Sequence, residues 1–204
     1  MKLYYMGGSC SLASHICLYE AGVKFEAVGL DRKNRTFPDG EKLESLNSKG
    51  YVPILKLDNG QILTENVAVL LYIADLNPAA KLAPPAGTTL ERYRLIEWLA
   101  FINSEIHKSY GPLFHRESSD DMKKFALGNL TKRLGWLNTN LGDRKFIAAE
   151  HFTAADAYLF VVLNWAGAIK LDLAQFPNLK RIHGELTLRP SVVSALNAEK
   201  PVKS

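Results

Sequence analysis

The sequence predicts an α+β N-terminal part followed by an all-α helical bundle. Up to about residue 77, short apolar runs alternate with segments of helical spacing in the order βαβ, a loop, then ββα. Residues 78–87 (PAAKLAPPAG) are rich in Pro, Ala and Gly and predict a linker. From residue 88 onward the apolar patterns all have helical spacing, which predicts a second, helical part.

The first strand and the first helix meet at a cysteine. The apolar run 3–6 predicts a strand, Gly7-Gly8-Ser9 ends it, and Cys10 opens a helix that ends at Gly22. Unpaired N–H groups and the positive end of the helix dipole converge at such a junction and favour the thiolate, which is the reactive form of cysteine. A small buried side chain is the alternative role for a single cysteine. Position and flanking glycines favour the functional role for Cys10.

The remaining elements of the N-terminal part follow from spacing and turn residues. They are a strand at 25–30, a short helix at 41–46, two hairpin strands at 51–57 and 61–63, and a helix from 64 or 65 to 75. Asn59-Gly60 predicts the hairpin turn. Pro53 cannot donate to a sheet ladder, so we expect it at a strand start or an edge.

Two apolar stripes and one capping motif organise the helical part. The stripes contain Leu95, Leu99, Ile102 and Ile106, and then Leu127, Leu130, Leu134, Leu137 and Leu141. Thr153 to Asp156 predict a capping box, and the helix behind it, 154–167, is apolar nearly all round and is expected to be central and buried. A last helix is expected after Pro190, with a loosely ordered tail from Glu199.

Composition excludes several classes of function. The chain has 204 residues and a net charge of +4, but its basic residues are scattered, and the densest cluster, 32–35, lacks the interleaved aromatics of a nucleic-acid site. No run approaches the roughly 18 apolar residues of a membrane span. No apolar stretch resembling a signal peptide stands at the N-terminus, so the expected location is cytoplasmic. Seven helical residues would hold Cys10 and Cys17 about 10 Å apart, too far for a disulfide, which suits a reducing compartment.

Five motifs in order resemble the glutathione transferases, and most closely the bacterial beta class. They are KLYYMGGSCSLASHI at 2–16, KGYVPIL at 49–55, LTENVAVLLYIAD at 63–75, IEWLAFINSEIHKSYGPLF at 96–114 and HFTAADAYLF at 151–160. The resemblance implies a thioredoxin-like domain over 1–78 that binds glutathione. It also implies an all-helical domain over 88–204 that completes the electrophile site, a cis bond between Val52 and Pro53, and a homodimer.

The function implied by the resemblance is transfer of glutathione, as co-substrate, to small hydrophobic electrophiles. Cys10 and His107 are the implied catalytic residues. The implied glutathione-binding residues are Cys10, Arg35, Val52, Pro53, Glu65, Asn66, Ser104 and His107. No metal, nucleic acid or membrane partner is expected, because the histidines at 115, 151 and 183 show no ligand spacing with cysteines or acids.

The chemistry of glutathione explains these residue types. A helix N-terminus at Glu65-Asn66 can bind the γ-glutamyl carboxylate through backbone N–H groups, and Glu65 can pair with the ammonium group. Val52 can offer its N–H and C=O to the cysteinyl part as an added strand. In similar proteins the histidine that His107 matches lies close to the cysteine and to glutathione, where it could act as acid or base. For three of these residues a role outside binding and catalysis stays open: Glu65 complements the helix dipole, Arg35 is a solvated charge, and His107 is structural.

Four positions depart from the beta-class pattern. Asn66 replaces a serine, Ala100 an asparagine that reaches glutathione, Tyr51 a glutamine and Gly7 a proline. These changes concern affinity and substrate preference. Tyr5 and His15 are expected to be structural.

Three functions compete on this sequence. The first is glutathione conjugation. The second is glutathione-dependent thiol–disulfide exchange or peroxide reduction, in which Cys10 forms a mixed disulfide with glutathione. Cys10 favours the second, because simple conjugation does not need a protein thiol. The third is a non-catalytic dimer that binds hydrophobic ligands.

Overall fold

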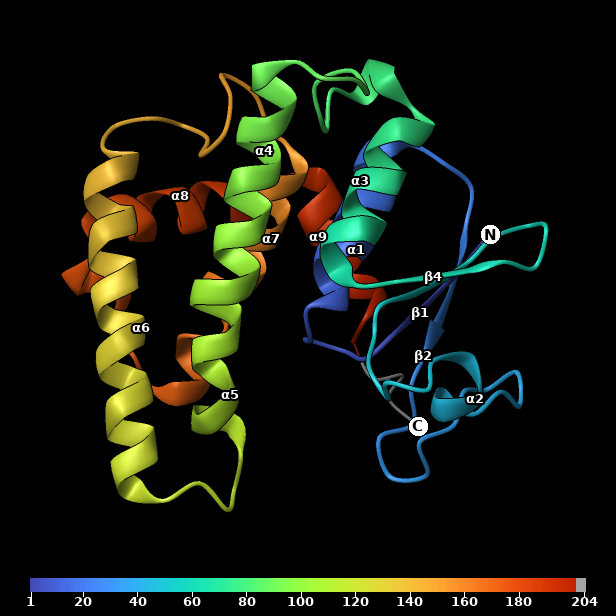
Figure 1. Ribbon diagram of the computed structural model, residues 1–204, viewed down its shortest axis with the longest axis horizontal. Helices are drawn as coiled ribbons and strands as arrows, with labels where there is room; N and C mark the ends of the chain where they lie inside the picture. The colour runs from blue at the N-terminus through green and yellow to red at the C-terminus, as the bar shows by residue number, and fades with distance from the viewer. Residues whose placement is uncertain (201–204) are drawn as a thin grey trace. The chain divides into compact units, whose positions relative to one another are not determined.

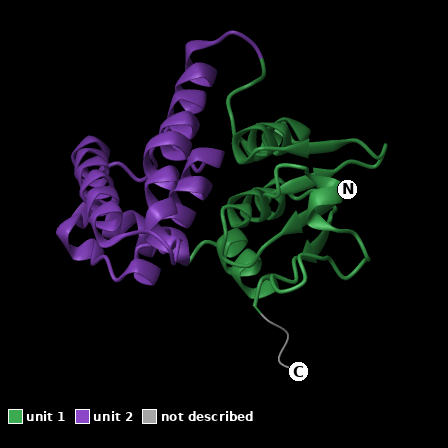
Figure 2. Ribbon diagram, turned by 60° about the horizontal axis from the view of Figure 1, so that its bottom comes forward, with its two compact units in different colours: residues 1–86, 188–204 green, residues 87–187 purple. Residues whose placement is uncertain are grey.

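The chain divides into two compact units, shown in green and purple in Figure 2. The computed structural model describes residues 1–200. The first unit contains residues 1–86 and the segment from Leu188 onward, and the second contains residues 87–187. The last helix therefore belongs with the N-terminal residues, although the sequence had grouped 88–204 as one helical part. The functional division into a glutathione domain, 1–78, and an electrophile domain, 88–204, stays a prediction.

The first unit is a four-stranded mixed sheet with helices, as its sequence predicts (Figure 1). Its elements are β1 (Lys2–Tyr5), α1 (Ser11–Ala21), β2 (Glu26–Gly29), α2 (Leu43–Leu46), β3 (Ile54–Lys56), β4 (Ile62–Thr64), α3 (Asn66–Leu76), the short 3₁₀ helix η1 (Pro78–Ala80) and α9 (Pro190–Ala198). The strand order is β2-β1-β3-β4. β1 pairs with β2 in parallel, and β1–β3 and β3–β4 are antiparallel. The expected thioredoxin-like order βαβ-ββα is confirmed.

The two central strands of the sheet, β1 and β3, are buried on both faces. Tyr4, Val28 and Ile54 form one buried cluster with Leu43 and Leu46 of α2. The alternate residues Leu3 and Leu55 are also fully buried. Helix α1 packs against β1 and against α3 and α9, and its own side chains are buried almost throughout.

The second unit is entirely helical within the described residues. Its elements are α4 (Leu90–Phe101), the π-helical turn η2 (Ile102–His107), α5 (Lys108–Phe114), α6 (Asp120–Leu141), α7 (Ala154–Asn164), the 3₁₀ helices η3 (Gly167–Ile169) and η4 (Leu173–Gln175), and α8 (Pro177–Thr187). Every residue of α7 from Ala154 to Leu163 is buried, so its predicted central position is confirmed. The predicted capping box at Thr153 and Asp156 is present.

Two expectations about individual residues were wrong. Leu127 is 39% exposed, because the smaller Ala126, four residues before Leu130, occupies the buried position on that stripe of α6. Glu199, expected to start a loosely ordered tail, is held in place: its side chain is 4% exposed and its Oε1 lies 3.0 Å from Nδ1 of His15. The rest of the expected tail, from 201 to 204, lies outside the described residues. The sequence also missed α8, although Leu179, Ile182 and Leu186 give it a clear buried face.

No helix in the stretch 1–200 is both long enough and apolar enough to cross a membrane.

Candidate functional site

Cys10 occupies the N-cap of α1, where the sequence predicts a reactive thiol. Its side chain makes no capping hydrogen bond. Its Sγ instead donates to the carbonyl oxygen of Val52, 3.3 Å away. The first turn of α1 contains no acidic residue to oppose the positive helix end. Cys10 is half-buried, whereas Cys17 is completely buried in the same helix. The environment of Cys10 therefore suits a nucleophile, and that of Cys17 does not.

The loop from Asn47 to Pro53 connects the predicted binding residues of the first unit. Asn47 is buried and shapes the loop: its side-chain amide donates to Tyr51 O at 2.9 Å, and its Oδ1 accepts from Lys49 N at 3.2 Å. The Val52–Pro53 peptide bond is cis, as expected from the resemblance. Because Pro53 precedes β3, it takes no place in the sheet ladder. The loop thus presents Val52 O to the thiol of Cys10.

Glu65 is the N-cap of α3 and has a left-handed backbone, with φ 71°. Such a conformation is unfavourable for a residue with a side chain, so the surrounding structure must hold it. Its carboxylate is exposed and forms an ion pair with Lys49, Oε1 to Nζ, at 2.5 Å. The carboxylate therefore stands at the helix N-terminus, but it already has one cationic neighbour.

Asn66 lies inside the unit rather than on its surface. Its side chain is buried, and its Oδ1 accepts a hydrogen bond from Ser14 Oγ of α1 at 2.9 Å. Its Nδ2 has no hydrogen-bond partner within the described residues. Asn66 therefore ties α3 to α1, and what it offers outward is its backbone N–H at the start of the helix.

Arg35 lies in the loop between β2 and α2 and pairs with Glu44 of α2, with Nη2 and Oε1 2.5 Å apart. Both side chains are about half exposed. The guanidinium also lies close to the backbone of Gly50, where a Cβ would come within 3.1 Å of Nη2. Gly50 has φ +71°, so its lack of a side chain serves both the backbone turn and the approach of Arg35. The loop 47–53 consequently contacts Arg35, Cys10 and Glu65.

His107 ends η2 in the second unit, and its ring is held by two neighbours. Its Nδ1 lies 2.6 Å from the hydroxyl of Tyr158, and its ring packs edge-on against Trp165 with centroids 4.8 Å apart. Tyr158 in turn donates to Oδ1 of Asn103 at 2.9 Å. Burial, with a smaller contribution from the charge of Lys108, lowers the pKa of His107 to about 4. At neutral pH the imidazole is therefore uncharged.

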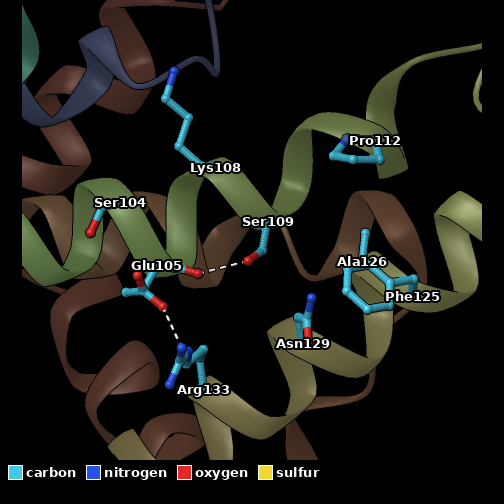
Figure 3. Close-up of a pocket in the computed structure, with 9 residues that line it drawn as sticks. All are labelled: Ser104, Glu105, Lys108, Ser109, Pro112, Phe125, Ala126, Asn129 and Arg133. Atoms are coloured by element: carbon cyan, nitrogen blue, oxygen red, sulfur yellow. Dashed lines mark hydrogen bonds and ion pairs between the residues drawn. The ribbon is translucent and has the colours of Figure 1, made fainter.

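Ser104 is an exposed residue of η2 that lines a pocket of the second unit. The pocket, of about 330 Å³, is formed by η2 and α5 on one side and by α6 on the other, and His107 is not part of the lining (Figure 3). Across this pocket Glu105 Oε2 pairs with Arg133 Nη2 at 2.7 Å.

Sequence reasoning did not single out several residues that contact the predicted ones, among them Lys49, Asn103 and Tyr158. All three stand inside quoted motifs, but their partners are set by loop and helix geometry that spacing does not reveal. Tyr5 and His15 are in structural surroundings, since Tyr5 Oη donates to Ala198 O at 3.4 Å and His15 is fully buried. Among residues 1–200, His, Cys, Asp and Glu side chains nowhere gather in threes as metal ligands.

Comparison with known proteins identifies the family. Residues 1–75 match the model of the glutathione S-transferase N-terminal domain, and residues 101–190 match that of the C-terminal domain. Glutathione S-transferase GstA of Escherichia coli O157:H7 is 42% identical over 199 residues, which span 98% of each chain.

The chain belongs to the glutathione S-transferase family.

Solved structures agree with this family and with the beta class. A bacterial beta-class glutathione S-transferase from Sphingomonas chungbukensis has 47% identity and a TM-score of 0.94, covering 99% of this transferase and 100% of that chain. A sphingomonad glutathione S-transferase complexed with glutathione has 45% identity and a TM-score of 0.94, with 98% of both chains covered. The resemblance inferred from the five motifs is confirmed for the whole length of this transferase.

Proposed function

We propose that this transferase binds glutathione and conjugates it to small hydrophobic electrophiles, and that Cys10 also exchanges disulfides with glutathione. Family membership supports the conjugation reaction, and a relative solved with glutathione supports the co-substrate. The observation that carries the second activity is the position of the Cys10 thiol, 3.3 Å from the carbonyl of Val52 beside a cis-proline.

Each end of glutathione has a proposed partner in the first unit. The cysteinyl part adds as a short strand to the backbone of Val52 beside Pro53. The γ-glutamyl carboxylate takes the backbone N–H groups at Asn66, and the ammonium takes Glu65. Arg35 supplies a cation for the second carboxylate. Support for these roles comes from the loop 47–53, which contacts Arg35 through Gly50, Cys10 through Val52 and Glu65 through Lys49.

The exchange reaction needs only thiols and disulfides. The Cys10 thiolate attacks one sulfur of oxidised glutathione, a bond forms between the two sulfurs, and one glutathione leaves as its thiolate. A second glutathione thiolate then attacks the mixed disulfide and releases the Cys10 thiolate. Each step breaks one disulfide bond and forms another, so no further oxidant or reductant is needed.

In the second unit, we propose that His107 acts as acid or base on the reacting thiol and that Ser104 contacts glutathione. His107 is neutral at neutral pH and can therefore accept a proton. Ser104 is exposed on the pocket beside Glu105.

We also propose a homodimer and a cytoplasmic location. Dimerisation is typical of the family, and the two cysteines, present as thiols, suit a reducing compartment. Sedimentation at micromolar concentration tests the dimer, and a mass near 22.7 kDa would contradict it.

Mass spectrometry after incubation with oxidised glutathione tests the exchange function. One glutathionyl group should be added to the wild-type protein and to Cys17→Ala, and none to Cys10→Ala. The added group should leave on treatment with reduced glutathione. If the wild-type protein stays unmodified, the exchange activity is excluded, and conjugation is the one of the two proposed activities that remains.

A further inference from the structure

The π-helical turn η2 brings two polar side chains to one hydroxyl group. In a π turn the backbone hydrogen bonds run from each residue to the fifth along, so the helix is wider than an α-helix. Asn103 and His107 stand four residues apart in this turn and both contact the hydroxyl of Tyr158, at 2.9 Å and 2.6 Å. Tyr158 belongs to α7, whose residues in this region are all buried. A rare helix geometry thus coincides with a three-residue hydrogen-bond chain.

The protons in this chain can be assigned from its donors and acceptors. A tyrosine hydroxyl has one proton, and Tyr158 donates it to Oδ1 of Asn103, an oxygen that can only accept. The contact between Tyr158 and His107 must then use a proton on Nδ1 of the imidazole. A neutral imidazole carries only one N–H group, so Nε2 of His107 holds the lone pair.

Packing keeps the ring of His107 in this orientation. The ring lies between Tyr158, at a centroid distance of 5.9 Å, and Trp165, at 4.8 Å, and meets both nearly at right angles. Turning the ring over would break the 2.6 Å hydrogen bond. His107 is only partly buried, whereas His15 is completely buried. Since Tyr158 engages Nδ1, Nε2 is the ring nitrogen left to meet a ligand.

We propose that Tyr158, oriented by Asn103, is a positioning residue that fixes His107 as the Nδ1–H tautomer and so makes Nε2 the nitrogen that accepts the thiol proton. This inference rests on the acid–base role proposed for His107. As the glutathione sulfur forms its bond to the electrophilic carbon, the leaving group departs with the electron pair of its own bond. In the same step the S–H bond breaks and an Nε2–H bond forms, and the imidazolium keeps its Nδ1–H bond to Tyr158. The proton then passes to water, which completes the cycle.

The uncharged state of His107 is what this role requires. Burial lowers the pKa of His107 to about 4, so at neutral pH the lone pair of the imidazole is available to accept a proton. Nε2 accepts the proton while the sulfur forms its new bond, as a general base does. The hydrogen bond from Nδ1–H to Tyr158 stabilises the positive charge that develops on the ring.

Nitrogen NMR tests the tautomer directly. In ¹⁵N-labelled protein at neutral pH, the long-range ¹H–¹⁵N spectrum should show His107 with a protonated Nδ1 and an unprotonated Nε2, the signal being assigned by its loss in His107→Gln. Tyr158→Phe should shift this pattern toward the Nε2–H form. Tyr110→Phe is the matched control, because Tyr110 is an equally buried tyrosine whose hydroxyl finds no hydrogen-bond partner in residues 1–200. A protonated Nε2 in the wild-type protein, or an unchanged pattern in Tyr158→Phe, would overturn the proposal.

Conjugation kinetics separate positioning from a general structural effect. Tyr158→Phe should lower kcat, by less than the roughly 10²-fold loss expected when the base itself is removed. KM for glutathione should stay nearly unchanged. In a His107→Gln background, Tyr158→Phe should lower kcat no further, because Tyr158 acts on the reaction only through His107. A further loss in that background would contradict the proposal. If His107→Gln alone leaves kcat unchanged, the acid–base role of His107 fails, while the spectrum still decides the tautomer.

Discussion

The thiol of Cys10 and the carbonyl oxygen of Val52 are joined by a hydrogen bond of 3.3 Å across the start of α1 and the cis-proline loop. Two opposite influences meet at this sulfur. The positive end of α1 favours the thiolate, whereas donation to a carbonyl favours the protonated thiol. In the proposed complex the cysteinyl amide of glutathione uses the same carbonyl as its acceptor.

Ligand binding should therefore break the hydrogen bond between the Cys10 thiol and Val52 O, and so favour the thiolate. We expect saturating S-methylglutathione, which has no thiol to exchange, to increase the thiolate absorbance of the wild-type protein at neutral pH. Cys10→Ala should show no such increase. An unchanged thiolate signal at saturation would mean that Val52 does not control the ionisation of Cys10.

Substitution of the two cysteines should separate the two proposed activities. Cys10→Ala should abolish thiol–disulfide exchange and only reduce conjugation, because in conjugation the nucleophile is the glutathione sulfur. Cys17→Ala should affect neither activity, since Cys17 is fully buried in α1. Iodoacetamide labelling across pH, with the modified residue mapped, provides a second check. Modification of Cys17 before Cys10 would be incompatible with an activated Cys10.

Glu65 should matter for glutathione affinity more than its neighbour Lys49. Glu65→Ala should weaken binding by about 1–3 kcal/mol, the usual effect of removing a charged hydrogen-bond partner. Lys49→Met breaks the 2.5 Å ion pair but leaves the carboxylate in place. Because both side chains are largely exposed, that loss should change affinity by no more than about 1 kcal/mol. Titration calorimetry on both variants measures the difference, and equal affinities for wild type and Glu65→Ala would remove Glu65 from the site.

The depressed pKa of His107 predicts a pH dependence of stability. In the unfolded chain a histidine titrates near 6.5, and in the folded protein burial lowers the pKa of His107 to about 4. Protons therefore bind the unfolded chain more readily. The contribution of the neutral imidazole is fully present above about pH 6.5 and is lost as the pH falls toward 4.

Urea unfolding at several pH values can test this slope. His107→Gln should lose less stability than the wild-type protein between about pH 6.5 and pH 4. Some slope should remain in the variant, because burial also lowers the pKa of His183. Identical slopes for the two proteins would show that His107 titrates alike in the folded and unfolded chains.

Asp156 should be the most costly polar residue to remove from the second unit. It is completely buried, and its two carboxylate oxygens accept from Ile147 N, Thr153 N and the Thr153 hydroxyl, each at 2.8 Å. Asp156→Ala should lower the free energy of unfolding by about 3 kcal/mol or more, since each buried donor left unpaired costs about 1–3 kcal/mol. Asp172 is the matched control, an exposed helix cap that accepts from Ala174 N at 2.8 Å. Asp172→Ala should cost about 1 kcal/mol, and urea denaturation compares the two.

Local sequence signals predicted most of the fold. The order βαβ-ββα followed from short apolar runs and turn residues, and the burial of α7 followed from a helix that is apolar all round. The N-cap position of Cys10 followed from the glycines that end β1. Leu127 was misplaced because two apolar residues, Ala126 and Leu127, compete for one stripe of α6, and spacing alone does not rank them.

The hydrogen-bond partners within the candidate site could not be predicted in the same way. Asn103 and His107 stand four residues apart, so helical spacing already puts them on one face, but it does not show that this face meets the hydroxyl of Tyr158 on α7. Lys49 reaches Glu65 only through the path of the loop shaped by Asn47. The ion pair of Arg35 with Glu44 likewise depends on how the loop after β2 approaches α2.

The return of the chain to its first unit affects the order in which that unit can be completed during synthesis. Glu199 accepts a hydrogen bond from Gly8 N at 2.9 Å through Oε2 and contacts His15 through Oε1, so a residue that follows the whole second unit in the chain holds the loop in front of Cys10. Helix α9 likewise covers α1. A nascent chain that has emerged only as far as residue 187 therefore has the strands of its sheet but not the contacts that hold the loop in front of its cysteine.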